Sequence, residues 1–192
     1  ERQAFDFFQP EGVARGTMIF VHGGYWKAFD RSIWSHLATG ALARGWAVAM
    51  PSYDLCPDVR IADITRQIAA AVTRVADRTF GPLALAGHSA GAYNVVQAAL
   101  EEKWLSRIGV MPRGVVGLAG PYDFYPFDKD SSQDAFGSVG AGSDSQPVNH
   151  ARADAPPMLL IHGERDTLVK PRNTRALAKA LRDVGAPVET RF

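Results

Sequence analysis

The stretch Pro82–Gly91, PLALAGHSAG, decides the fold expected for this chain. Its first half is an apolar run typical of a buried strand. Its second half, Gly87–Gly91, has the form G-x-S-x-G and precedes a run of small residues typical of a helix. A serine on so sharp a turn needs glycine neighbours, because two backbone segments approach each other closely there. The pattern therefore predicts that Ser89 is a catalytic nucleophile.

A second glycine-rich segment supports this prediction. The apolar run Thr17–Val21 is typical of a buried strand and leads directly into His22–Trp26, HGGYW. Backbone N–H groups in a glycine-rich loop after an early strand can stabilise a developing negative charge. We expect the amides of Gly24, Tyr25 and Ala90 to form such an oxyanion hole. The alternative is a plain glycine turn whose two following aromatic residues pack in the core.

A third apolar run, Pro157–His162, precedes a loop that carries the candidate acid. Asp166 lies in this loop, after a late strand, where a carboxylate can orient a catalytic histidine. Glu164 and Asp123 are alternative acids. Asp166 could also be an ordinary turn or helix-start carboxylate.

These motifs resemble those of α/β-hydrolases of the esterase and lipase group. HGGYW is similar to the H-G-G-x-W motif of kynurenine formamidases, in which the amides of the second glycine and its neighbour form the oxyanion hole. The stretch Leu159–Val188 resembles feruloyl or acetyl esterase-like and prolyl-oligopeptidase-like hydrolases. The resemblance extends from about Thr17 onward and implies an α/β-hydrolase fold. Strands that alternate with helices along the chain also favour a mainly parallel sheet with helices on both faces.

The chain departs from this pattern at the general base. The order in this fold is serine, acid, histidine, but no histidine occurs between Asp166 and Phe192. We expect His22, His88 and His162, which lie at strand ends, to form local hydrogen bonds instead. The remaining histidines are His36, on a predicted helix, and His150, which precedes the acid. Since Glu1 is not a start methionine either, we expect a fragment that lacks terminal elements, with the base beyond Phe192.

Composition restricts the other function classes. The 192 residues fit a single domain over 1–192, and a formal net charge of +1 gives no basic surface for nucleic acid. No apolar run reaches the roughly 18 residues of a membrane span, and no signal peptide is visible. We expect a cytoplasmic protein, with export left open. Cys56 is the only cysteine, and dinucleotide, phosphate-loop and zinc motifs are missing from the sequence, so no metal or other cofactor is expected.

The pattern also predicts individual elements. Apolar residues at helical spacing predict a helix from Ile61 to Val75, and a second helix is expected over Arg172–Val184. Glu1–Pro10 indicates an early strand, and Gly114–Gly120 and Val188–Phe192 are predicted strands. The stretch 128–149 is rich in Ser, Gly and Asp, and we expect either a lid or a flexible loop there.

The expected function is hydrolysis of a carboxylic ester of a small or aryl substrate through an acyl-enzyme on Ser89. Aromatic residues near the predicted strand ends could bind an aryl group, although most aromatic residues in any domain are core. Trp26, Tyr122 and Phe124 are the expected substrate-binding residues. The alternatives are arylformamide hydrolysis, a serine peptidase, and a binding protein without catalysis.

Overall fold

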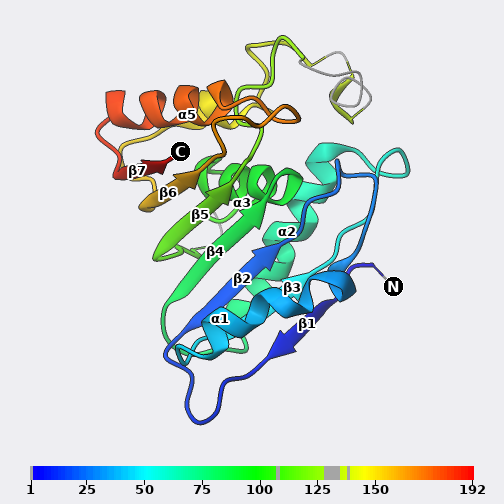
Figure 1. The fold of residues 1–192 in the computed structure, drawn as a ribbon, viewed down its shortest axis with the longest axis vertical. Helices are drawn as coiled ribbons and strands as arrows, with labels where there is room; N and C mark the ends of the chain where they lie inside the picture. Colours follow the sequence, from blue (N-terminus) through cyan, green and yellow to red (C-terminus); the bar gives the residue numbers. More distant parts are fainter. Residues whose placement is uncertain (1, 107–108, 128–134, 138) are drawn as a thin grey trace.

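A computed structural model describes residues 2–106, 109–127, 135–137 and 139–192 (Figure 1). Seven strands form one sheet in the order β1-β3-β2-β4-β5-β6-β7. Among the strand pairings of the described residues, only that of β1 with β3 is antiparallel. The strands are β1 (Phe5–Phe8), β2 (Thr17–Val21), β3 (Ala47–Pro51), β4 (Leu83–His88), β5 (Gly114–Leu118), β6 (Met158–Ile161) and β7 (Val188–Arg191). The mainly parallel sheet predicted from the sequence is confirmed.

Helices cover both faces of this sheet. The α-helices are α1 (Thr39–Leu42), α2 (Ile61–Ala76), α3 (Ala90–Leu100) and α5 (Arg172–Asp183), and the 3₁₀ helices are η1 (Arg31–Ala38) and η2 (Pro147–His150). Helices α2, α3 and α5 contribute to one apolar cluster, while η1 contributes to another. Figure 1 shows η1 and α1 in front of the sheet and α2 and α3 behind it.

Alternation along the strands builds these two clusters. In β2, Ile19 and Val21 belong to the cluster with α2 and α3, whereas Phe20 belongs to the cluster with η1. Side chains of a strand alternate between the faces of a sheet, so an all-apolar strand serves two cores. Because β2 to β7 run parallel, they all end at one edge of the sheet, where the loops that follow them meet.

The predicted elements agree with the structure apart from small differences at their ends. The predicted strand Gly114–Gly120 ends at Leu118, because Ala119 has a φ of +50° and leaves the extended conformation. The predicted helix Arg172–Val184 ends one residue earlier. The antiparallel edge strand β1 was expected as a strand, but its direction was not predicted.

The stretch 128–149 falls partly outside the described residues, which exclude 128–134 and 138. Its described part is attached to α3. The Tyr93 hydroxyl donates to the Ser145 carbonyl at 2.8 Å, and Gln97 Nε2 donates to the Asp144 carbonyl at 2.7 Å. The choice between a lid and a flexible loop stays a prediction. Within the described ranges, no helix is long and apolar enough to cross a membrane.

Candidate active site

Ser89 lies on a strained turn between β4 and α3. Its φ is +52° and its ψ is −118°, a conformation that L-residues rarely adopt and that is often retained at functional sites. A Cβ atom on Gly87 would overlap the backbone of Gly91, and one on Gly91 would overlap the carbonyl oxygen of Val21. The Ser89 amide donates to the Leu118 carbonyl at 2.8 Å. The two glycines and this hydrogen bond hold the serine at the carboxyl edge of the sheet.

The loop 22–26 lies directly against this serine. A Cβ atom built on Gly23 would be 3.2 Å from the Ser89 Cβ. Gly24 has a φ of +124°, and its carbonyl accepts hydrogen bonds from the amides of Lys27 and Ala28 at 2.9 and 3.0 Å. The Gly24 and Tyr25 amides donate to no residue that the structure describes. The Gly24 amide therefore belongs to a fixed turn and has its hydrogen available.

The third predicted donor, Ala90, is the first residue of α3. The first N–H groups of a helix have no partner within that helix, and they carry the positive end of its dipole. Its amide and those of loop 22–26 lie on two segments that meet at Ser89. The structure thus brings the predicted nucleophile and the predicted donor segments together.

His22 fixes the conformation of loop 22–26. Its ring is buried and stacks on Tyr53, with ring centroids 4.6 Å apart and an 11° interplanar angle. Its Nδ1 lies 2.7 Å from the Gly23 carbonyl oxygen. A carbonyl only accepts, so Nδ1 carries the proton and donates. Burial lowers the pKa of His22, which keeps the ring neutral near pH 7.

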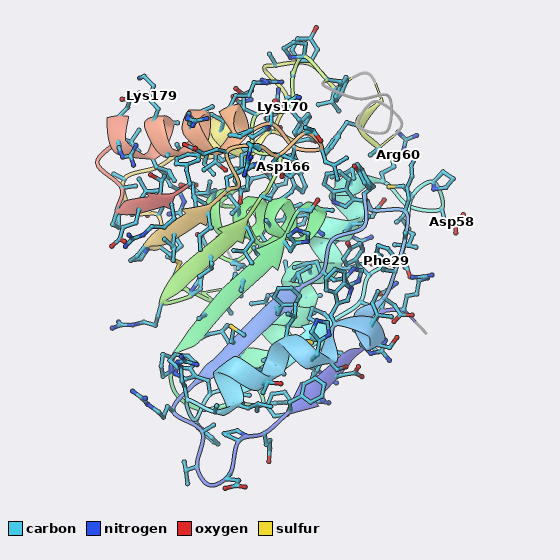
Figure 2. All side chains as sticks on the ribbon, viewed as in Figure 1. Phe29, Asp58, Arg60, Asp166, Lys170 and Lys179 are labelled. Carbon is cyan, nitrogen blue, oxygen red and sulfur yellow. The ribbon has the colours of Figure 1, made fainter. Side chains whose placement is uncertain are left out.

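Asp166 follows β6, and Figure 2 places it beyond the sheet at the edge where the parallel strands end. Its Oδ1 accepts the amides of Leu168 and Val169 at 2.8 and 3.0 Å. Burial lowers the pKa of His88, and the negative charge of Asp166 opposes that shift.

The alternative acids are held differently. Glu164 is exposed, and its carboxylate forms no hydrogen bond with any described residue. Asp123 donates its amide to Asn173 Oδ1 at 2.9 Å, but among the described residues its carboxylate is not hydrogen bonded. Asp166 is the candidate with an orientation fixed by two amides.

The expectation of local hydrogen bonds is confirmed for His22 and His162. His162 Nε2 lies 2.8 Å from the Val169 carbonyl and its Nδ1 lies 2.7 Å from Thr174 Oγ1, so both nitrogens are engaged. The expectation is wrong for His88, which forms no hydrogen bond within the described chain although Trp34 packs beside its ring. A Cβ atom on Gly23 would be 3.2 Å from its Nδ1, so the ring lies against loop 22–26.

The described chain places no histidine in hydrogen-bond contact with the Ser89 hydroxyl. His36 is exposed on η1, and His150 Nε2 pairs with the Asp144 carbonyl. Over the described residues, no group of three or more histidine, cysteine or acidic side chains could hold a metal ion.

The three predicted substrate-binding side chains are buried. Trp26 is 3% exposed and donates from Nε1 to Asn94 Oδ1 at 3.1 Å. Tyr122 fills the space above two glycines near the end of β5, and Phe124 stacks on Phe136 with centroids 3.9 Å apart. Direct contact between these side chains and a substrate stays a prediction. In this structure all three pack in the core.

Phe29 is one of the aromatic residues near the predicted strand ends, but the sequence did not single it out for substrate binding. Phe29 is 53% exposed, and its Cδ2 lies 2.9 Å from the position that a Cβ on Gly24 would take. Its φ of +73° allows this approach. A positive φ at a phenylalanine leaves no signal in the sequence, so only the structure could bring Phe29 to the site.

The BD-FAE family model matches residues 5–181 of this chain. The chain belongs to the BD-FAE family. The α/β-hydrolase fold and the esterase and lipase type implied by the motifs are thereby confirmed.

Individual relatives agree with BD-FAE membership. Kynurenine formamidase from Drosophila melanogaster is 31% identical over 129 residues, covering 64% of this chain and 43% of the relative. Esterase LipC from Mycobacterium tuberculosis is 29% identical over 203 residues, covering 88% of this chain and 48% of the relative. The chain spans about half the length of the curated relatives it matches.

A solved structure shares the fold of this chain over its whole length. A protein from Silicibacter sp. TM1040, provisionally described as a thioesterase, is 40% identical with a TM-score of 0.87. The match covers 100% of this chain and 72% of that protein. The fold around Ser89 is therefore shared with a solved relative.

Proposed function

We propose that this chain carries the catalytic core of a serine hydrolase that cleaves carboxylic esters through an acyl-enzyme on Ser89. One observation carries the proposal: Ser89 is held at a φ of +52° between two glycines where a Cβ atom would overlap neighbouring backbone, with Gly23 packed against its side chain. Strain of this kind costs about 1–3 kcal/mol and persists where function requires it.

The proposed reaction follows from the groups around the serine. Ser89 Oγ attacks the ester carbonyl carbon while a general base takes its proton, and the carbonyl oxygen becomes an oxyanion. The amides of Gly24, Tyr25 and Ala90 donate to that oxyanion. The intermediate then expels the alcohol, which receives the proton, and water hydrolyses the acyl-enzyme by the same steps. Asp166, fixed by two amides, orients the base.

The substrate is an ester or amide of small size, and we place the ester first because an alkoxide or phenoxide is the better leaving group. Relatives named as esterases match 88% of the chain. The second candidate is hydrolysis of an aryl formamide. It is favoured by the HGGYW sequence at 22–26 and by the relatives named kynurenine formamidase.

The first test uses the full-length protein with p-nitrophenyl acetate to decanoate and with formanilide. We expect turnover that is lost in Ser89→Ala and retained in Ser35→Ala, a control serine whose hydroxyl bonds to a backbone carbonyl on η1. A fluorophosphonate probe should modify Ser89 in the wild type. Turnover that survives Ser89→Ala would contradict the proposal.

The remaining outcomes separate the alternatives. Faster turnover of formanilide than of any ester would favour the formamidase. Cleavage of a fluorogenic peptide would favour a peptidase. A protein that neither reacts with the probe nor turns over any substrate would be a binding protein with this fold.

A further inference from the structure

Phe29 presents an aromatic face beside the proposed oxyanion hole. Its ring is in contact distance of Gly24, since its Cδ2 lies 2.9 Å from where a Cβ on Gly24 would be. The side chain is nevertheless 53% exposed. The labelled side chains of Figure 2 place Phe29 near the ends of β2 and β3. An exposed aromatic ring thus adjoins the residue whose amide would bind the substrate oxygen.

The backbone holds this ring in place at a conformational cost. Phe29 has a φ of +73°, and Tyr25 and Trp26 in the same loop also have positive φ. The Phe29 carbonyl accepts a hydrogen bond from Arg2 Nη1 at 2.9 Å. A bulky residue with φ above zero is unusual, and such strain is typically retained at binding and catalytic sites.

A second aromatic residue, Trp34, packs against the ring of Phe29. The Trp34 ring meets Phe29 edge to face, with centroids 6.2 Å apart at 79°. The same indole lies 6.2 Å from the ring of His88, the neighbour of the nucleophile. Trp34 therefore lies between Phe29 and the ring of His88, the residue before Ser89. Trp34 is partly buried, so Phe29 presents the larger free surface.

We propose that Phe29 is a specificity-determining residue that contacts an aryl ring of the substrate next to the scissile carbonyl. The inference rests on the proposed function, because it needs an ester or amide carbonyl bound at Gly24. Aromatic rings attract one another in offset-stacked or edge-to-face geometry, so an exposed phenyl wall selects an aryl group over a short alkyl group. Trp26, Tyr122 and Phe124 stay predicted aryl-binding residues, and Phe29 adds an exposed ring to them.

The test compares matched substrates in the full-length protein. The first pair compares phenyl acetate, which has an aryl ring in the leaving group, with ethyl acetate, which has none. The second pair compares methyl benzoate, which has an aryl ring in the acyl group, with methyl acetate, which has none. In Phe29→Leu we expect kcat/KM for one aryl ester to fall roughly two- to tenfold, mainly through KM, with its alkyl partner unchanged. The affected pair identifies which side of the scissile bond meets the ring.

Two variants and a folding measurement control for folding and for loss of apolar surface. Phe29→Tyr keeps the ring and should keep the aryl preference. Phe80→Leu removes a phenylalanine that is 94% exposed, and it should leave kcat/KM unchanged for all four esters. Circular dichroism and thermal melting of Phe29→Leu report whether the substitution has unfolded the protein.

Each other outcome overturns the inference in a recognisable way. An equal loss for aryl and alkyl esters in Phe29→Leu would show that the residue only shapes the loop. No change for any of the four esters would show that the ring does not contact the substrate. Absence of all turnover and of fluorophosphonate labelling in the wild type would overturn the proposed function together with this inference.

Discussion

His22 Nδ1 donates a hydrogen bond to the carbonyl oxygen of Gly23 at 2.7 Å. That carbonyl shares one planar peptide with the N–H of Gly24, so a hydrogen bond that fixes the oxygen also fixes the direction of the amide. Donors in an oxyanion hole are effective because they are oriented before the charge develops. His22 therefore acts on the proposed reaction as a positioning residue, through the loop that it holds.

Replacement of His22 should lower kcat and leave KM nearly unchanged. Loss of a whole oxyanion donor lowers kcat by a factor of about 10²–10³. We expect His22→Ala to lower kcat by between roughly one tenth of that factor and the whole factor. His22→Asn retains an N–H donor and should recover part of the loss. The control His36→Ala removes an exposed ring on η1 and should have no effect. An increase in KM with unchanged kcat would contradict the positioning role.

The neutral state of His22 makes the stability of the protein depend on pH. Burial lowers the pKa of His22 below the ordinary value of about 6.5, so the unfolded chain binds a proton that the folded chain does not. The free energy of unfolding should therefore decrease as pH falls below about 6.5. Urea unfolding at pH 7.5 and 5.5 would measure this decrease. It should be smaller in His22→Asn, and an equal decrease in both proteins would exclude His22 as its source.

The two glycines of the turn can be tested by stability alone. Gly91→Ala would drive a methyl group into the Val21 carbonyl, and Gly87→Ala would drive one into the Gly91 backbone. Each should lower the free energy of unfolding by about 1–3 kcal/mol or more. Gly163→Ala is the matched control, because a Cβ there meets no described atom within 4 Å. Equal stability of the three variants would argue against the close approach at Ser89.

Trp26 separates a core role from substrate contact. Trp26→Phe removes the donor to Asn94 Oδ1 and leaves a buried acceptor unpaired, which costs about 1–3 kcal/mol. The loss should shrink in an Asn94→Ala background, as a double-mutant cycle of urea unfolding would measure. KM for phenyl acetate should stay within about twofold of the wild-type value. A large rise in KM with unchanged stability would restore Trp26 as a substrate-binding residue.

The strands and the turn at Ser89 could be predicted because local sequence determines them. Thr17–Val21 and Pro82–Gly91 combine apolar runs with glycines whose steric role is independent of distant residues. Helix α2 was equally clear, since its apolar residues recur at helical spacing.

The side-chain environment of the site depends on contacts between distant segments, which one sequence does not specify. Trp26 is buried because Asn94 and Phe136 meet it from two other segments. Phe29 is at the site because of a positive φ that its residue type does not predict. His88 was expected to bond locally, but it packs beside Trp34 and forms no hydrogen bond within the described chain.

Asp166 gives the sharpest test of the proposed acid. In Asp166→Asn the amide oxygen can still accept the amides of Leu168 and Val169, so the loop should keep its shape while the charge is lost. We expect kcat for p-nitrophenyl acetate to fall by roughly 10³–10⁴, as when a carboxylate no longer orients a catalytic histidine. Glu164→Gln removes an exposed charge two residues away and should leave kcat unchanged. If Glu164→Gln caused the loss and Asp166→Asn did not, the acid would be Glu164, and the hydrogen bonds to Asp166 would serve only the turn.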